Sequence, residues 1–243
     1  MKKFNFKNTP PFYPDWDVNI REFYSSEFKN IFVILNPFIL LKGDYDRNNQ
    51  KHNRWFDNQT MDYPTSEYIN EFCREIKWQY IVEHSKLNTV AEINHALIHH
   101  GLKKQYQNEK LAESLSDYCN KENIFYPPDA EFTPYNISRI TELLNDLKID
   151  SIELTSEFGD YKTELKPKEL KLLLTEYKYH SPTIMATDKS LIFVNHWDSF
   201  ITILATNREV SEQKLNSLGL EIKNTNEFPT LNYRNKNYAQ HRL

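Results

Sequence analysis

The chain contains only four glycines, and their scarcity limits its possible chemistry more than any other feature. They are Gly43, Gly101, Gly159 and Gly219, so each stands far from the next. Phosphate-cradling loops, dinucleotide-binding fingerprints and kinase-type loops need several glycines within a few residues, because the backbone must approach the phosphates closely. The hydrolase elbow needs a glycine on both sides of a serine, and no Gly-x-Ser-x-Gly occurs. The sequence therefore excludes all of these motifs.

The cysteines add a second exclusion. Cys73 and Cys119 are the only thiols, and both fall on apolar faces of expected helices. Two cysteines without a Cys-x-x-Cys pair cannot build a tetrahedral zinc site alone. The N-terminus has a basic start with no apolar stretch behind it, so no export signal is expected. We therefore expect free, buried thiols in a reducing, cytoplasmic setting, and no cofactor is predicted.

The charge balance bears on the choice of partner. The formal net charge is -4, and a mildly acidic chain is a poor match for nucleic acid or for an anionic membrane. No apolar run approaches the roughly 20 residues that a spanning helix needs. The longest such run, 31–41, is interrupted by Asn36 and Pro37. A protein is therefore the expected partner, with neither a membrane nor a nucleic acid.

Helical periodicity dominates the middle of the chain. A helix capped by Thr65 is expected to carry Ile69, Phe72, Cys73, Ile76 and Tyr80 on one face. The stretch 89–92 has capping-box spacing and opens a helix that runs to about His100 and stops at Gly101. Gly101 and Gly219 are both expected to take the left-handed conformation after a helix. Further helices are predicted around 111–118 and from Thr133, Pro167 and Ser211, while 44–62 is predicted to be a loop.

Strands are predicted at 31–35, 151–155, 183–187, 191–197 and 200–206. The last three are expected to be antiparallel, with turns at 188–189 and 198–199. Both faces of the latter two are apolar, which favours a central position between helices. The prediction is an α+β fold with a helical middle region plus a C-terminal antiparallel sheet covered by helices.

The domain organisation follows from the same pattern. Residues 1–243 are expected to form one compact unit. The stretch Tyr126-Pro127-Pro128-Asp129 is the best boundary candidate. A possible subdivision is therefore a mainly helical region with an N-terminal strand at 1–128, followed by an α+β region at 129–243.

One helix carries a pattern that fits a metal site. Glu92, His95 and His99 are spaced i, i+3 and i+7, which places them on one helical face with the spacing of metal ligands. Two structural explanations compete with this one. Glu92 already belongs to the capping box, and histidines near a helix C-terminus are favoured by the helix dipole. A di-iron bundle would need a second Glu-x-x-His, and none is present.

Two further patterns were weighed. His196 and Asp198 lie on the predicted hairpin beside Ser199, but such close neighbours cannot form a catalytic triad by themselves. The stretch 78–100 has the lengths of a helix-turn-helix. Its second helix offers Asn94 and histidines toward bases, with neither lysine nor arginine, so a packed helical hairpin is the alternative.

Several segments resemble a known but uncharacterised family. They are 78–83, 92–97, 111–115, 125–127 and Trp197-Asp198-Ser199-Phe200, all built mainly on aromatic and aliphatic positions. This pattern is similar to the YwbB-like proteins of Bacillus-type bacteria over roughly residues 30–230. The resemblance implies a cytosolic bacterial origin and transfers no functional residue.

The leading hypothesis is a soluble, cytoplasmic, non-catalytic protein that binds another protein, as an immunity or accessory factor. The missing glycine loops, the mild acidity and the many aromatic residues support it, because tyrosine and tryptophan are good interface anchors. The alternative is a metal-dependent or histidine-based hydrolase centred on His95 and His99 or on His196. A second alternative is a helix-turn-helix DNA binder.

Overall fold

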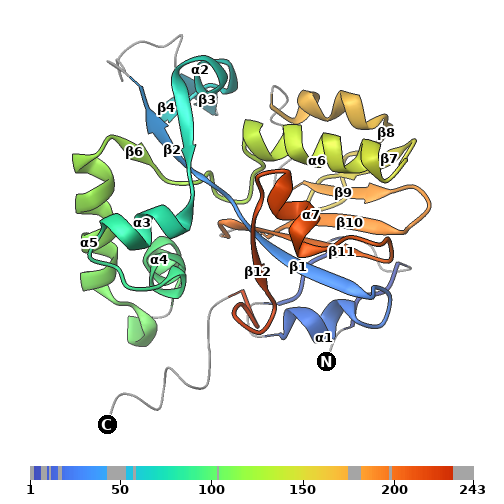
Figure 1. Ribbon diagram of the computed structural model, residues 1–243, viewed down its shortest axis with the longest axis horizontal. Coiled ribbons are helices and arrows are strands. Elements are labelled where there is room, and N and C mark those ends of the chain that lie inside the picture. Colours follow the sequence, from blue (N-terminus) through green and yellow to red (C-terminus); the bar gives the residue numbers. More distant parts are fainter. Residues whose placement is uncertain are drawn as a thin grey trace.

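A seven-stranded antiparallel sheet forms the centre of the computed structural model, in the order β12-β1-β11-β10-β9-β7-β8 (Figure 1). The structure describes residues 3–6, 10, 12–15, 18–42, 53–56, 59–102, 104–174, 182–196 and 199–231. The strands of this sheet are β1 (Asn30–Leu35), β7 (Ile152–Thr155), β8 (Lys162–Leu165), β9 (Thr183–Ala186), β10 (Leu191–Asn195), β11 (Ile201–Thr206) and β12 (Glu221–Asn224). Together with the helices, this sheet confirms the mixed α+β class.

The sheet does not belong to the C-terminal part alone. The N-terminal strand β1 pairs with β11 on one side and with β12 on the other. Both neighbours are antiparallel to β1 and hence parallel to each other, and α7 (Glu212–Ser217) connects them. This is a split β-α-β arrangement. The expected antiparallel sheet of C-terminal strands is therefore present, and it also includes the strand predicted at 31–35, which was assigned to the mainly helical region. Since β1 is apolar on both faces, it is stable only in the interior of a sheet.

Each face of the sheet belongs to a different hydrophobic cluster. Phe32 and Ile34 of β1 pack in one cluster with α6 (Pro134–Asp146), α7 and Leu170 of the 3-10 helix η3 (Pro167–Leu174). Val33 and Leu35 face the other cluster, which takes its members from the N-terminal segment, α1 (Ile20–Tyr24) and the helical region. The alternating residues of one strand thus join the two cores.

A smaller sheet organises the helical region, in the order β5-β2-β6. Its strands are β2 (Phe38–Leu41), β5 (Cys73–Ile76) and β6 (Ile124–Phe125). The helix expected to run from Thr65 through Tyr80 is broken by β5 into α2 (Ser66–Phe72) and α3 (Trp78–His84). Cys73 and Ile76 suit a helical stripe by spacing, but they lie opposite Leu41 and Phe38 of β2. This long-range pairing overrides the local pattern.

A hairpin occupies part of the expected 44–62 loop. It consists of β3 (Asn53–Phe56) and β4 (Gln59–Pro64), which pair antiparallel. Residues 43–52, which include Gly43, lie outside the described part of the chain. The abundance of asparagine, glutamine and aspartate in this stretch predicted a loop, and a two-stranded hairpin tolerates the same residues.

The helix ends follow the expected capping rules in part. Thr89 caps α4 (Val90–Leu97) by accepting a hydrogen bond from the Glu92 backbone N–H at 3.1 Å. The helix ends earlier than expected, and Gly101 belongs to a 3-10 turn without a positive φ. Gly219 does adopt the left-handed conformation, at φ 88°, where it ends α7. Its role was therefore predicted correctly and that of Gly101 was not.

Polar contacts tie the helical region to the large sheet. Lys77 provides no side-chain cap for α3, and Glu221 of β12 does so instead. Its carboxylate accepts hydrogen bonds from the backbone N–H groups of Trp78 at 2.7 Å and Gln79 at 3.0 Å. Arg139 of α6 forms a two-pronged ion pair with Glu75 of β5. Both contacts join segments that are far apart in the sequence.

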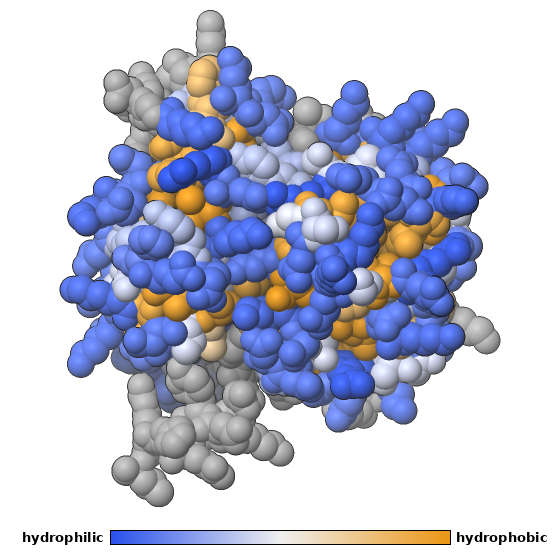
Figure 2. Space-filling view, viewed as in Figure 1, coloured by the Kyte–Doolittle hydropathy of each residue, from blue (hydrophilic) through white to orange (hydrophobic). Residues whose placement is uncertain are grey.

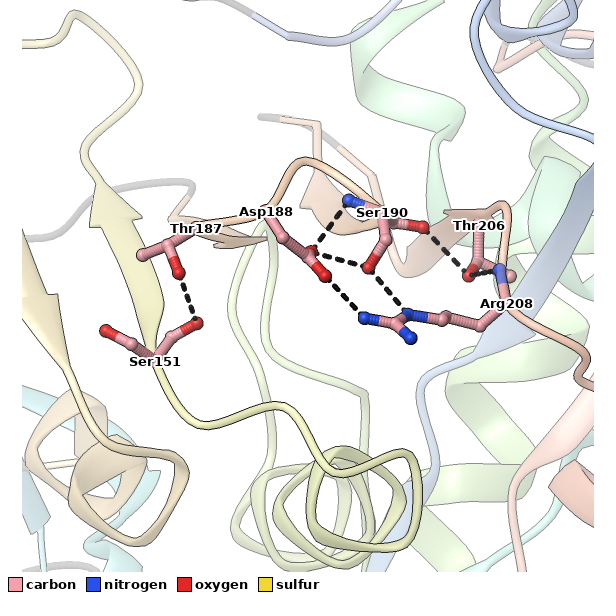
Figure 3. A network of polar contacts seen from close by, with 6 residues as sticks. All are labelled: Ser151, Thr187, Asp188, Ser190, Thr206 and Arg208. Atoms are coloured by element: carbon pink, nitrogen blue, oxygen red, sulfur yellow. Dashed lines mark hydrogen bonds and ion pairs between the residues drawn. The ribbon is translucent and has the colours of Figure 1, made fainter.

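The turn between β9 and β10 forms as expected and is held by a side-chain network (Figure 3). Asp188 accepts hydrogen bonds from the Ser190 backbone N–H at 3.0 Å and from its hydroxyl at 2.6 Å. Arg208 pairs with the same carboxylate and donates to the Ser190 hydroxyl at 2.9 Å. Thr206 donates to the Ser190 carbonyl at 3.1 Å. The network fixes the turn to the end of β11.

Within the described residues, no helix is both long and apolar enough to cross a bilayer. Figure 2 shows that polar side chains cover most of the face in view, with smaller apolar areas between them.

Candidate functional site

The three expected metal ligands each have a local hydrogen bond. A Glu92 carboxylate oxygen accepts from the Asn88 backbone N–H at 2.7 Å. His95 Nε2 lies 2.7 Å from the Tyr106 carbonyl and donates to it, whereas His99 Nδ1 accepts from the Asn108 backbone N–H at 3.1 Å. The bonds of His95 and His99 fasten α4 and the turn after it to the segment that leads into α5 (Glu109–Lys121), and the Glu92 bond closes the N-terminal end of α4.

The helical face on which these ligands were expected is interrupted. α4 ends at Leu97, so His99 lies in the following 3-10 turn and is 6 % exposed. Among the residues that the structure describes, no group of three His, Cys, Asp or Glu side chains is arranged to hold a metal ion. Metal binding at Glu92, His95 and His99 stays a prediction.

The hairpin pair is described only in part. Asp198 lies outside the described residues, so its distance from His196 is not part of the structure. His196 is 2 % exposed and packs edge-on against Tyr13, with ring centroids 4.3 Å apart. Tyr13 in turn donates a hydrogen bond to the Glu157 carboxylate, and burial raises its pKa. His196 thus helps to hold the N-terminal segment against the end of the sheet.

The helical pair α3 and α4 has the lengths of a helix-turn-helix, but its second helix is turned inward. Asn94, the residue with the best base-reading side chain, is 2 % exposed. Ile93, Ala96 and Leu97 are buried around it. A recognition helix must present such a side chain to the major groove. In this arrangement α4 packs as an ordinary core helix.

A cavity of about 510 Å³ lies where α5, β6 and the segment 126–131 meet. We call it the α5–β6 pocket. Its volume falls within the range of small-ligand sites, about 300–1,000 Å³. Four aromatic side chains line it, from Tyr63, Phe125, Tyr126 and Phe200. Its acidic lining residues are Asp129 and Glu131, and Ser116, Asn120 and Asn123 add polar groups. The pocket combines apolar surface with negative charge.

Local backbone chemistry shapes the pocket. Asn123 takes a left-handed φ of 54° after α5 and turns the chain into β6. β6 pairs with β2 for only two residues, and Pro127 and Pro128 prevent further pairing because proline has no N–H to donate. Ala130 follows with φ 54°, an uncommon value for a residue with a Cβ. Its N–H donates to the Ser199 carbonyl at 2.9 Å, which holds the turn in place.

A buried network of hydrogen bonds centred on Asn36 connects the pocket to the large sheet. The Asn36 Oδ1 atom accepts from Asn136 Nδ2 at 2.9 Å and lies 2.9 Å from Thr202 Oγ1. Its Nδ2 donates to the Glu131 carbonyl at 3.4 Å, and its backbone N–H donates to the Phe200 carbonyl at 3.2 Å. Asn36 is 0 % exposed. Two pocket residues, Glu131 and Phe200, are therefore tied to the end of β1.

The same network extends across the sheet. Thr202 Oγ1 also lies 2.6 Å from Asn195 Oδ1. A hydroxyl carries one proton, so Thr202 donates to only one of its two amide partners at a time. Asn195 is fully buried, and its Nδ2 atom has no hydrogen-bond partner among the residues that the structure describes. The Thr202 hydroxyl can point to Asn36 or to Asn195, and in neither orientation does the Asn195 Nδ2 donor gain an acceptor.

The thiol of Cys119 and the phenol of Tyr126 on the pocket wall stay neutral. Burial raises the pKa of Cys119 to about 12 and that of Tyr126 to about 12. Both groups are protonated at neutral pH, so Cys119 is not an activated nucleophile. No lysine, arginine or histidine occurs among the described lining residues. The wall can bind a ligand, but its thiol and phenol are poorly suited to attack one.

Comparison with known protein families identifies the family of this chain. A family model described as "Protein of unknown function (DUF2711)" matches residues 17–227. The chain belongs to this family. No curated protein and no solved structure matches it. The residues matched to DUF2711 include the α5–β6 pocket, the Asn36 network and all the predicted site residues. Assignment to the YwbB-like proteins or to Bacillus-type bacteria stays a prediction.

Sequence reasoning did not find the pocket. Its aromatic and acidic residues come from β4, β6, the 126–131 turn and the residue before β11, and no short motif joins them. The only local signal was the run Tyr126-Pro127-Pro128-Asp129, which was interpreted as a domain boundary. An aromatic residue, two prolines and a carboxylate in sequence also describe a rigid wall of a binding site.

Proposed function

We propose that this protein is a non-catalytic factor, of the immunity or accessory type, that binds another protein through the α5–β6 pocket. One observation carries the proposal: the pocket places aromatic rings beside acidic side chains. Burial raises the pKa of the Cys119 thiol and of the Tyr126 phenol to about 12, so these two groups stay protonated at neutral pH. Catalysis by attack or proton transfer needs a group poised to ionise near neutral pH. Aromatic surface beside charge is instead typical of the anchoring parts of protein interfaces.

The setting belongs to the same proposal. A cytoplasmic location fits two cysteines that are both free and buried. A single compact unit fits the larger hydrophobic cluster, whose members range from Phe4 to Leu231 and so lie on both sides of residue 128. A protein that binds a partner without catalysing a reaction benefits from such a continuous core, because the core keeps the binding surface pre-organised.

A photo-cross-linking experiment tests this function. Asn120 is an exposed residue of α5 that lines the pocket, and Asn145 is an exposed residue of α6 that does not. Each is replaced in turn by a photo-reactive phenylalanine in the full chain, which is then irradiated in extract of the source cells. We expect one discrete protein adduct from position 120 and none from position 145. The captured protein, once purified, should bind the unmodified chain at 1:1 stoichiometry by calorimetry.

Two outcomes contradict the proposal. Equal adducts from both positions, or none from position 120, would show that the pocket is not an interface. The other contradicting outcome is a bound metal ion. We expect elemental analysis of the wild type, His95→Ala and His99→Ala proteins to show no stoichiometric ion. About one metal per chain, lost in both variants, would favour the hydrolase alternative.

A further inference from the structure

Within the described residues, β8 is the last strand of the large sheet and pairs with β7 alone (Figure 1). A strand at the edge of a sheet presents backbone N–H and C=O groups that can pair with a further strand. A lysine on the edge often prevents such pairing, and β8 carries one, Lys162. Glu164, of the opposite charge, stands two residues later, and both residues are exposed. A strand that offers matching charges can therefore still pair with this edge.

The hydrogen bonds to β7 show which backbone groups of β8 point outward. The Ser156 N–H donates to the Tyr161 carbonyl at 3.0 Å, one step beyond the β7–β8 ladder and in the same register. Antiparallel neighbours exchange hydrogen bonds at every second residue. Counting from Tyr161, Thr163 therefore bonds to β7, whereas Lys162 and Glu164 direct their N–H and C=O groups away from it. The outer edge thus offers the donors and acceptors of these two residues.

Two glutamates face each other across β7 and β8. Glu164 lies directly opposite Glu153, and like charges in this position repel each other. The lysines nearby both pair with Glu153, since Lys162 Nζ lies 2.7 Å and Lys189 Nζ 3.8 Å from one of its carboxylate oxygens. Glu164 instead accepts a hydrogen bond from the Ser151 hydroxyl. A cation beside Glu164 on the outer side of β8 would therefore offset the repulsion.

We propose that β8 pairs antiparallel with β8 of a second copy of this chain, about a twofold axis at Thr163. In this register Lys162 of each copy lies opposite Glu164 of the other, and the outward N–H and C=O groups of these residues bond to each other. Each Lys162 supplies the cation that the glutamate pair of the other copy lacks. The two large sheets become one continuous sheet. This edge includes none of the residues that line the α5–β6 pocket, so the inference goes beyond the proposed function and does not depend on it.

The other face of β8 fits the same register. Tyr161 and Leu165 stand two residues on either side of Thr163, so each Tyr161 falls opposite Leu165 of the second copy. Tyr161 is 47 % exposed, and Leu165 is only partly buried against the core. Residues that face each other without exchanging hydrogen bonds lie closest in an antiparallel ladder, and an aromatic ring gains from an apolar neighbour there. The strand is therefore complementary to itself in apolar contact as well as in charge.

Sedimentation equilibrium of the full chain tests the inference. We expect a reversible dimer with a dissociation constant of about 100 µM or tighter, as for a small, transient interface. Lys162→Glu places glutamates opposite each other at both ends of the pairing, and Glu164→Lys does the same with lysines. Each change should raise the dissociation constant about tenfold or more. The controls Lys110→Glu and Glu113→Lys change the net charge equally at exposed positions of α5, and they should leave it within about twofold.

Two further samples separate the pairing of β8 from a failure to fold. The double variant Lys162→Glu with Glu164→Lys restores opposite charges across the edge, and so does an equimolar mixture of the two single variants. Both samples should dimerise about as tightly as the wild type. In the wild type, amide exchange at Lys162 and Glu164 should slow as the protein concentration rises, because their N–H groups become bonded.

Three outcomes would overturn the inference. The first is a wild-type chain that stays monomeric at several times the expected dissociation constant. The second is a dimer that both single charge reversals leave intact, which would place the contact elsewhere on the surface. The third is a mixture of the single variants that stays monomeric although each variant is folded.

Discussion

Asn36 is predicted to stabilise the fold far more than its position after a strand suggests. We consider Asn36→Leu, which keeps the size of the side chain and removes its polar atoms. In the wild type, Asn36 Oδ1 accepts from Asn136 Nδ2, and Nδ2 donates to the Glu131 carbonyl. After the substitution the buried Asn136 Nδ2 and the part-buried Glu131 carbonyl both lose these hydrogen bonds. Thr202 keeps one, because its hydroxyl can turn to Asn195.

The expected loss in the free energy of unfolding follows from the number of hydrogen bonds removed. Each buried polar group left without a partner costs about 1–3 kcal/mol. Two such losses would give about 2–6 kcal/mol, and the partial burial of the Glu131 carbonyl together with its long 3.4 Å bond places the expected loss in the lower half of that range. We therefore predict a loss of about 2–4 kcal/mol in the free energy of unfolding. That is a large part of the roughly 5–15 kcal/mol that holds a typical domain folded.

Urea denaturation followed by tryptophan fluorescence measures this loss. The matched control is Asn145→Leu, at an exposed position of α6, which should change the free energy of unfolding by less than about 0.5 kcal/mol. A double-mutant cycle with Asn136→Ala should give a coupling of about 1 kcal/mol or more between positions 36 and 136. A variant at position 36 as stable as the control, or strictly additive effects in the cycle, would refute the reasoning.

Four further predictions follow from single contacts. Glu221→Ala should lower the free energy of unfolding by about 1–2 kcal/mol in urea titrations, since two N–H groups at the start of α3 lose their acceptor; an effect below about 0.3 kcal/mol would contradict this role. Ala130→Gly should be neutral or stabilising by up to about 1 kcal/mol, because glycine adopts φ 54° without strain. The same change at Ala112, within α5, should destabilise by about 1 kcal/mol, so equal effects at the two positions would count against strain. Cys119, with a pKa raised to about 12 by burial, should react with iodoacetamide at pH 8 only in urea, and rapid labelling of the native chain would disprove its burial. Burial of Asp188 would raise its pKa, but the hydrogen bonds and the guanidinium charge of its Figure 3 partners outweigh burial and lower the pKa below 3.8. The folded pKa of Asp188 thus lies below its unfolded value, so its ionised form stabilises the fold above about pH 4 and this contribution is lost as the pH falls further. Asp188→Asn should therefore destabilise the protein at pH 6, by less than about 1 kcal/mol after solvent screening, and have no such effect in acid. A difference that does not depend on pH would argue against the ion pair.

The elements that the sequence predicted well are those whose signals are local. Residues 191–195 and 201–206 are largely apolar on both faces and are separated by a short stretch that contains the turn-forming pair Asp198-Ser199, and they form two central strands. Thr133 and Pro134 begin α6 as a capping residue and an N-terminal proline should. In these segments, residue type and spacing alone decide the structure.

The predictions from sequence fail where contacts with distant segments determine the local structure. The pattern of 65–80 is helical by itself, and only β2, some 30 residues earlier in the chain, converts its middle into a strand. Asn36 was interpreted as the end of a strand because its partners Asn136 and Thr202 are invisible in a linear reading. The α5–β6 pocket has the same origin, since Tyr63 and Phe200 reach it from opposite parts of the sequence.

The position of β1 affects how the chain can acquire its fold. β1 lies between β11 and β12, so a strand made early during synthesis must wait for residues 201–224 before either of its edges is covered. Contacts of such high sequence separation slow folding, because long loops must close before the strands gain any pairing energy. Until then, Ile31 to Leu35 present an apolar strand with two open edges, which is a template for aggregation. The nascent chain therefore depends on its last fifth, and a fragment that ends before β11 should not remain in solution without a chaperone.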